Sequence, residues 1–283
     1  MSPPPIRNAF SIDVEDYFQV SALAPHFPRN VWDQQPCRVE GNVDRMLGML
    51  ADSQATATFF TLGWVAERYP QMVKRIVAGG HELASHGYGH QRASDLTHAE
   101  FLDDVTRAKK ILEDLGGQPV VGYRAPSFSI GANNLWALDI LGDAGYQYSS
   151  SIYPIHHDHY GMPDAPRFAF RPTDAKPLIE LPATTIRLFN RNLPAAGGGY
   201  FRLLPYQLSR WLINRVNGID RQPCIFYCHP WEIDPDQPRP DGMTLKTRFR
   251  HYVNLGKTES RLRTLLKDFR WGRVDQIFLK AAA

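Results

Sequence analysis

Residues 9–16 read AFSIDVED, and this stretch decides the fold because an apolar strand leads directly into three carboxylates. Short apolar runs of the same kind recur at 56–61, 81–85, 120–123 and 146–148. Amphipathic stretches with helical spacing separate these runs, and strands that alternate with helices in this way are typical of a parallel sheet. The pattern therefore predicts an α/β fold.

Helix start and stop signals support this assignment. Pro70 begins one helix and Gly79-Gly80 end it, while Thr97 and Glu100 form the capping box of the next helix. After Ser151 the alternation loosens. We expect a loop at 152–176, a strand at 178–182, a helix at 205–217, a last buried strand at 224–228 and a basic amphipathic helix at 258–269.

Composition limits the classes of protein to consider. The chain has 283 residues, of which 43% are hydrophobic and 22% charged, and its formal net charge is +3. This balance is that of a globular protein rather than a disordered chain, and so small and evenly spread a charge argues against nucleic-acid binding. No apolar run approaches the ~20 residues that span a membrane.

The N-terminus and the cysteines indicate a compartment. The first residues lack a basic segment followed by an apolar one, so we expect no signal peptide. The three cysteines, Cys37, Cys224 and Cys228, do not have the spacing of a disulfide framework and are expected to be reduced thiols. We therefore expect a cytoplasmic protein.

Two groups of polar residues indicate a metal site. Asp13 and Glu15 follow the first strand, and on an extended backbone they point the same way. His86 and His90 follow the third strand, and their spacing lets them meet on one side of a helical turn. Two histidines and one carboxylate leave coordination positions for water and substrate, as a catalytic site requires. The simpler interpretation is a solvated acidic loop and a chance pair among ten histidines.

Two further polar groups also follow strands. Arg124 can hold a carboxylate through a bidentate contact, and Pro126 fixes the backbone so that the next N–H points in a defined direction. His229 emerges from the apolar strand at 224–228 and can donate a proton. The simpler interpretations are a surface arginine before a turn and a buried histidine satisfied by the backbone. All four groups belong at the carboxyl ends of parallel strands, where active sites of such sheets lie.

At these residues the chain resembles the polysaccharide deacetylases, the NodB-homology carbohydrate esterases. The matching segments occur in the family's order, at 10–15, 86–90, 124–126 and around His229. Residues 197–202 and 229–232, with the closing basic helix, resemble the deacetylases of bacterial exopolysaccharide and exosortase loci, which carry an extra C-terminal region.

The resemblance implies a distorted (β/α) barrel with fewer than eight regular strands. It would occupy residues 1–235, and residues 236–283 would form a C-terminal extension packed on the barrel. It also implies metal-dependent hydrolysis of N-acetyl groups on the amino sugars of a polysaccharide or oligosaccharide. As partners, the resemblance implies this glycan and the exopolysaccharide assembly machinery, and no nucleic acid.

The implied cofactor is a divalent metal, usually zinc, held by a carboxylate and two histidines. Most relatives have two adjacent aspartates in the first motif, whereas this chain has Val14 after the first aspartate. The ligands would then be Glu15, His86 and His90, with Asp16 as a fallback for Glu15.

The resemblance also implies roles for the remaining residues. Asp13 would be the general base, Arg124 would hold it ionised, and His229 would protonate the departing amine. Relatives tend to have an aspartate before the serines at 149–151, and in its absence Glu180 is expected to tune His229. Substrate contacts are expected from Pro126, Ser127, Tyr200 and Trp231, with the Ser127 N–H stabilising the oxyanion.

Two other functions stay open from the sequence. The same barrel could hydrolyse a small cyclic amide or imide, because the Asp13-x-Glu15 spacing is compatible with such relatives. A non-catalytic glycan-binding or assembly protein is the second, although an intact base, metal triad and acid argue against it. The basic helix at 258–269 could contact an anionic membrane or a synthase, but a solvated helix face is the simpler interpretation.

Overall fold

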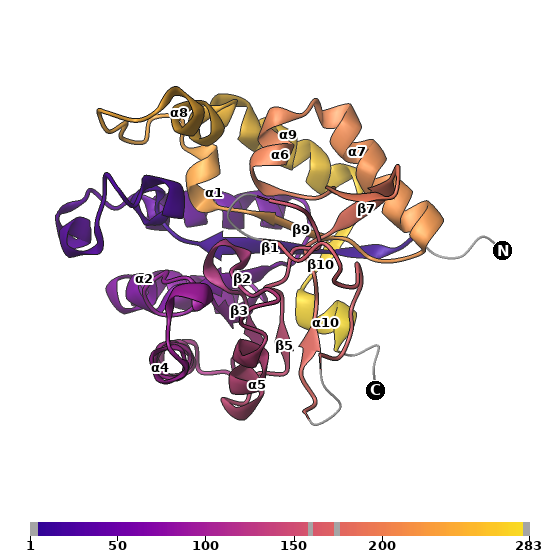
Figure 1. The fold of residues 1–283 in the computed structure, drawn as a ribbon. Helices are drawn as coiled ribbons and strands as arrows, with labels where there is room; N and C mark the ends of the chain where they lie inside the picture. Colours follow the sequence, from indigo (N-terminus) through magenta and orange to yellow (C-terminus); the bar gives the residue numbers. More distant parts are fainter. Residues whose placement is uncertain (1–4, 158–160, 173–175, 280–283) are drawn as a thin grey trace.

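The first predicted strand, β1 (Arg7–Val14), is buried from Asn8 onward and belongs to a parallel sheet in which it pairs with three other strands (Figure 1). The computed structural model describes residues 5–157, 161–172 and 176–279, so residues 1–4 and parts of the predicted 152–176 loop lie outside it. β1 pairs in parallel with β2 (Thr58–Thr61), β9 (Ile225–Cys228) and β10 (Arg270–Gly272).

The rest of the sheet curls away from β2 in sequence order. β3 (Glu82–Ser85), β4 (Gly122–Tyr123), β5 (Tyr148–Ser149) and β6 (Ile179–Glu180) follow, each parallel to the last. The sheet has eight strands in the described part of the chain, but β4, β5 and β6 span only 2 residues each. The predicted α/β class is confirmed, and the regular strands are fewer than eight. A separate antiparallel hairpin joins β7 (Thr185–Leu188) to β8 (Arg191–Pro194).

Helices cover both faces of this sheet. Their bounds are α1 (Val39–Asp52), α2 (Gly63–Arg68), α3 (Pro70–Ala78), α4 (His98–Gly116), α5 (Trp136–Asp143), α6 (Gly198–Leu203), α7 (Tyr206–Arg215), α8 (Leu245–Tyr252), α9 (Leu255–Asp268) and α10 (Val274–Phe278). In Figure 1, α1, α7 and α9 lie above β1 and β9, and α2, α4 and α5 lie below. The capping box predicted at Thr97 and Glu100 starts α4. No helix of the described residues meets the length and hydropathy needed to cross a membrane.

The C-terminal region contributes to the sheet itself. The prediction that the strand at 224–228 is the last one is wrong, because β10 follows it and pairs with β1. Periodicity could not find β10, since a strand of 3 residues is too short to show alternation. Within the expected extension, 236–283, the apolar side chains expected to face inward are Leu262, Leu265, Leu266 and Phe269. The three leucines of α9 are buried, and Phe269 directly after it is half-buried.

Two of the cations of α9 are engaged within the fold. Arg261 donates hydrogen bonds to three backbone carbonyls at and just after the C-terminal end of α6. Arg263 pairs with Glu259 on the same helix and with Asp52 at the end of α1. Both arginines therefore fix α9 to neighbouring elements.

A buried carboxyl group anchors the start of α10 at the opposite end of the sheet from the predicted site. Glu82 accepts hydrogen bonds from the hydroxyls of Thr58 and Tyr148 and from the backbone N–H of Asp275. Burial foremost, and then the charge of Asp275, raise the pKa of Glu82 to about 7. Between pH 4.5 and about pH 7, Glu82 therefore keeps its proton in the folded chain and loses it in the unfolded chain.

This raised pKa predicts that stability falls as pH increases. Below the ordinary pKa of 4.5, Glu82 is protonated in both the folded and the unfolded chain. As the pH rises toward 7, the unfolded chain loses the proton first, so the free energy of unfolding falls by on the order of 1–3 kcal/mol. Glu82→Gln should flatten this decline when urea unfolding is measured between about pH 5 and pH 8. The exposed Asp103→Asn is the control, and a variant that keeps the full wild-type slope would contradict the assignment.

Candidate active site and metal centre

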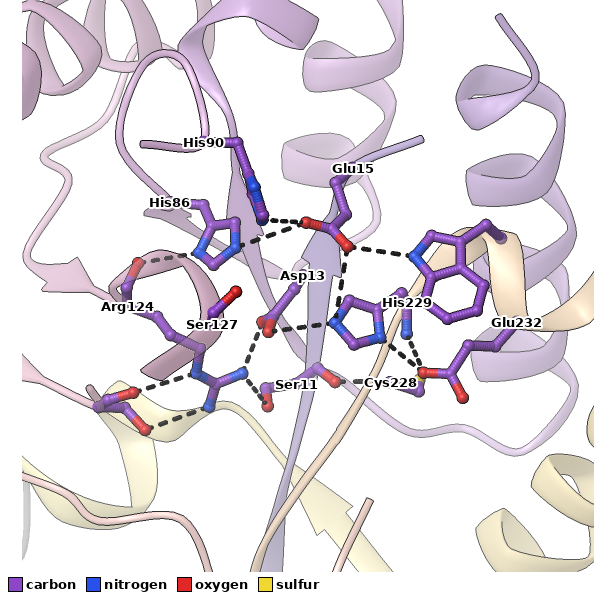
Figure 2. A network of polar contacts seen from close by, with 12 residues as sticks. Ser11, Asp13, Glu15, His86, His90, Arg124, Ser127, Cys228, His229 and Glu232 are labelled. Carbon is purple, nitrogen blue, oxygen red and sulfur yellow. Dashed lines mark hydrogen bonds and ion pairs between the residues drawn. The ribbon is translucent and has the colours of Figure 1, made fainter. Parts of the chain in front are cut away.

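The predicted side chains converge where four parallel strands end (Figure 2). β1 supplies Asp13 and, one residue beyond its end, Glu15, while the chain after β3 supplies His86 and His90 and the chain after β9 supplies His229. These five side chains line one pocket. Arg124 follows β4 and contacts Asp13. These side chains lie close together because parallel strands direct their carboxyl ends to the same edge of the sheet.

Three of these residues offer ligand atoms to one point. The ligand atoms of Glu15, His86 and His90 all lie within 4.8 Å of one another. Glu15 Oε2 is buried and has no hydrogen bond of acceptable geometry, although it lies 2.5 Å from His90 Nε2 and 3.9 Å from His86 Nε2. A buried carboxylate oxygen facing two imidazole nitrogens is the arrangement that a divalent cation satisfies.

The protonation states favour metal binding. His86 Nδ1 lies 2.8 Å from the backbone carbonyl of Arg124, a contact that places the proton on Nδ1 and leaves Nε2 free to coordinate. Burial lowers the pKa of His86 to about 4, so the ring is neutral at neutral pH. For Glu15, burial alone would raise the pKa, but the charges of His90 and His229 hold it well below its ordinary value. The residues present therefore fit a metal that prefers one carboxylate and two imidazoles.

The Asp16 carboxylate is not in a position to replace Glu15 as a metal ligand. Its carboxylate accepts hydrogen bonds from the backbone N–H groups of Tyr17, Arg38 and Val39, so it caps the short helix Tyr17–Gln19. Burial raises the pKa of Asp16 to about 6 even with these bonds. The structure thus brings Glu15, and not Asp16, to the histidines.

The two histidines meet through a loop and not through the predicted helical turn. Residues 86–90 are non-helical, and Gly87 (φ +75°) and His90 (φ +55°) have left-handed backbone conformations. At Gly87 a Cβ would lie 2.5 Å from the Asp104 carboxylate, so glycine is required there. Asp104, on α4, accepts hydrogen bonds from the N–H groups of Tyr88 and Gly89 and so fixes the loop.

Arg124 and Asp13 form a buried ion pair. The Arg124 guanidinium, only 1% exposed, lies 2.6 Å from Asp13 Oδ1 and also donates to Ser11 Oγ and to the backbone and hydroxyl of Ser150. Removing one member of such a pair leaves a buried charge without a partner. Oδ2, the other oxygen of Asp13, lies 3.8 Å from His229 Nε2. The pair therefore leaves one carboxylate oxygen of Asp13 facing the pocket.

His229 is held by a carboxylate that the sequence prediction did not choose. Its Nδ1 lies 2.6 Å from Glu232 Oε1, and Glu232 Oε2 in turn accepts a hydrogen bond of 2.7 Å from Arg202. Burial alone would lower the pKa of His229, but the nearby carboxylates, Glu15 and Glu232 foremost, raise it to about 9. A protonated imidazole with Nε2 toward the pocket can donate a proton there.

The prediction that Glu180 tunes His229 is wrong in this structure. Glu180 Oε1 accepts hydrogen bonds from the backbone N–H groups of Ser151 and Ile152, each 2.8 Å long. It therefore fixes the chain after β5. The signal for Glu232 was present in the sequence, since a carboxylate three residues after His229 matches a capping box, and this box starts the short helix Pro230–Ile233.

The four residues expected to contact the substrate differ in whether they line the catalytic pocket and whether they are accessible there. Ser127 lines the pocket with a left-handed backbone (φ +57°), and Pro126 is buried beside it. Trp231 also lines the pocket, but it is not available for stacking on a sugar because His229 and His251 cover its two faces at 5.2 and 4.4 Å. Its indole N–H donates to Glu15 Oε1 and so orients the ligand. Tyr200 is half-buried and lines an adjoining pocket.

Two family models match the chain, in adjacent regions. Residues 31–149 match the model described as "Polysaccharide deacetylase", and residues 150–279 match a "Domain of unknown function (DUF3473)". Similar curated proteins include a peptidoglycan deacetylase from Helicobacter pylori, 31% identical over 42% of this chain and 39% of its own length. A chitooligosaccharide deacetylase from Bradyrhizobium sp. is 29% identical over 34% of this chain and 42% of its own. The chain thus spans less than half of either relative.

Solved structures share the fold over the whole chain. A putative polysaccharide deacetylase from Mycobacterium smegmatis has a TM-score of 0.63 at 22% identity, covering 98% of this chain and 91% of its own. The Puue allantoinase has a TM-score of 0.61 at 16% identity, covering 98% and 92%. These matches confirm the predicted distorted (β/α) barrel.

Proposed function

We propose that this chain, which belongs to the polysaccharide deacetylase family through residues 31–149, removes N-acetyl groups from the amino sugars of a bacterial exopolysaccharide. The observation that carries the proposal is the geometry of Asp13. One of its carboxylate oxygens is paired with a buried arginine, and the other faces a pocket shared by a metal-type triad and a protonated histidine. Hydrolysis of an amide needs a base that takes a proton from water and an acid that protonates the departing amine, and the pocket offers a candidate for each.

Glu15, His86 and His90 are the residues that would hold a divalent cation, and we propose zinc. When bound, such a cation polarises the amide carbonyl and lowers the pKa of water, which makes hydrolysis accessible at neutral pH. Trp231 supports this role by fixing Glu15 Oε1 through a hydrogen bond of 3.1 Å, which leaves Oε2 to the histidines. Side chains that orient ligands in this way contribute strongly to metal affinity.

The proton transfers fall to Asp13 and His229. Asp13 takes a proton from the attacking water, and its ion pair with Arg124 keeps the carboxylate ionised and oriented. The backbone N–H of Ser127 stabilises the negative charge that develops on the acetamide oxygen. His229 donates a proton to the amine as the carbon–nitrogen bond breaks, and acetate and the free amino sugar leave.

The test is hydrolysis by the purified, metal-loaded chain of two substrate types. We expect acetate from oligosaccharides of N-acetylglucosamine and no ring opening of allantoin, a cyclic ureide. Ring opening of allantoin without acetate release would favour the cyclic-amide hydrolase. Lack of both reactions, together with no metal found by elemental analysis, would favour a binding or assembly protein.

The state of the cysteines supports a cytoplasmic location. Cys37, Cys224 and Cys228 are all free thiols, and the last two are buried on β9 or directly before it. A compartment that keeps thiols reduced suits such a chain. The match of residues 150–279 supports a role within exopolysaccharide biosynthesis, because the sequence resembles deacetylases of those loci over this same region.

Glu232→Gln is expected to lower kcat by roughly 10- to 100-fold, part of the general-acid contribution. Glu232 acts as a positioning residue, since it touches His229 and not the pocket centre, so KM and metal content should stay within about twofold of wild type. Glu180→Gln is the matched control, another buried carboxylate but one whose hydrogen bonds go to Ser149 and to the backbone N–H groups of Ser151 and Ile152. Equal kcat losses in both variants would contradict the role of Glu232.

A further inference from the structure

The catalytic pocket continues into a second pocket beside it. Five residues, Val20, Ser21, Ser127, Arg202 and Trp231, line both pockets. A wall shared to this extent makes the two hollows one cleft. A polymer whose acetylated sugar enters the catalytic pocket can therefore extend into the second pocket, which we call the flanking groove.

The flanking groove is basic. Arg92, Lys246 and Arg250 line it, and its described lining residues include no aspartate or glutamate. Arg92 is half-buried and Arg250 exposed, and neither forms an ion pair or side-chain hydrogen bond among the described residues. Elsewhere the arginines of this chain are commonly paired, as with Arg38, Arg75 and Arg263. Two unpaired guanidinium groups in one groove are therefore suited to an anionic ligand.

The charges of the catalytic pocket are already compensated. Asp13 is paired with Arg124, Glu232 is paired with Arg202 and His229, and Glu15 faces the two histidines that would hold a cation with it. The unpaired guanidinium groups therefore lie in the flanking groove and not at the reacting centre. A ligand that fits both parts has a neutral N-acetyl sugar next to an acidic one.

Helix α8 lines both the flanking groove and a third pocket. Arg250 also lines a third pocket, with Tyr200, Leu203 and Phe249, and that pocket shares Gly199 and Tyr227 with the catalytic pocket. Phe249 is 58% exposed, so its ring is accessible to a ligand in this pocket. Exposed aromatic faces beside guanidinium groups suit sugar rings that carry charged substituents. α8 lies within the region 150–279, so this region contributes to the lining of both adjoining pockets.

We propose that the substrate is an acidic glycan, in which sugars bearing carboxylates flank the N-acetylated amino sugar and bind Arg92 and Arg250. The proposal rests on the proposed deacetylase function and specifies its substrate class. A chain with repeated carboxylates matches a cleft whose cations come from two separate segments, the loop before residues 93–95 and α8. In this arrangement Arg92 of the region 31–149 and Arg250 of the region 150–279 select the polymer together.

The test measures binding, so that it stands apart from turnover. The Asp13→Asn chain is titrated with a hexasaccharide of alternating N-acetylglucosamine and glucuronate, and with a neutral N-acetylglucosamine hexasaccharide. We expect roughly tenfold tighter binding of the acidic hexasaccharide at low salt, and a smaller preference in about 0.5 M salt because ions screen exposed charges. N-acetylglucosamine 1-diphosphate serves as a third ligand, to separate carboxylate from diphosphate recognition.

Variants identify the residues responsible. Arg250→Ser and Arg92→Ser should each weaken binding of the acidic hexasaccharide by about fivefold and leave the neutral one unchanged. Arg248→Ser is the matched control, because Arg248 is exposed on the same helix but does not line the groove. Equal affinity for the acidic and neutral hexasaccharides, or equal effects of Arg248→Ser and Arg250→Ser, would overturn the proposal. Tighter binding of the diphosphate through the same arginines would also overturn it.

Acetate release by the wild-type chain is measured in parallel. If no oligosaccharide is deacetylated but the arginine-dependent preference for the acidic hexasaccharide is present, the proposed function fails and the binding assignment holds. If the neutral hexasaccharide is deacetylated and bound as tightly as the acidic one, the proposed function holds and the substrate class is overturned.

Discussion

Asp13→Asn is expected to lower kcat for acetate release by about 10³-fold or more, within the range that general acid–base catalysis supplies. The asparagine keeps the shape of the side chain but cannot take a proton from water. Because Asp13 is not among the triad residues, metal content should stay at the wild-type value. The measurements are steady-state acetate release and elemental analysis of the same sample.

The fold of this variant has to be checked, because Arg124 loses an ionised partner. Arg124 keeps hydrogen bonds to Ser11 and Ser150, so we expect a stability loss of roughly 1–3 kcal/mol rather than unfolding. Asp103→Asn, on the exposed side of α4, is the control for a neutralised aspartate. A folded Asp13→Asn chain with wild-type kcat would rule out Asp13 as the base.

His90→Ala is expected to abolish metal binding at micromolar concentrations, and activity with it. His90 provides one of three ligand atoms, and even the loss of a residue that only orients a ligand costs about 10- to 100-fold in affinity. Zinc affinity is measured by equilibrium dialysis after chelation, with and without added metal. Chelation of the wild-type chain should likewise stop acetate release, and zinc should restore it.

The control for this variant is His156→Ala. His156 is exposed and lies outside the catalytic pocket, so its loss should leave zinc affinity unchanged. If His90→Ala bound zinc as tightly as His156→Ala, the triad would not be the metal centre.

The sequence predicted correctly those site residues that come at or directly after the end of a predicted strand. Asp13, His86, Arg124 and His229 each follow or end an apolar run, and parallel strands bring such positions together regardless of helix details. The same reasoning does not fix local backbone shape. The histidines were expected on a helical turn, whereas Gly87 and His90 adopt left-handed conformations that Asp104 stabilises from a distant helix.

Side-chain partners were harder to predict than positions. Glu180 and Glu232 are both buried carboxylates close to the predicted site, and only the structure distinguishes the one that binds local backbone from the one that holds His229. Trp231 was expected to contact the substrate, as aromatic side chains can stack on sugar rings. Two histidines cover its faces instead, one of them from α8, which is far away in the sequence.

The site also draws on both regions matched by family models. His86, His90 and Arg124 lie within residues 31–149, whereas His229, Glu232 and Arg202 lie within 150–279. Asp13 and Glu15 precede both regions. The region of unknown function therefore contributes the proposed acid and its positioning partners, besides part of the lining of the flanking groove.

The most direct test of the central claim is the stoichiometry of the reaction on an N-acetylglucosamine hexasaccharide. Acetate and newly formed amine are counted together for the zinc-loaded wild-type chain and for Asp13→Asn. If the chain is a deacetylase with Asp13 as its base, the wild-type chain forms one amine for each acetate and the variant forms neither product. A folded, zinc-loaded wild-type chain that releases no acetate from acetylated oligosaccharides, neutral or acidic, would contradict this claim.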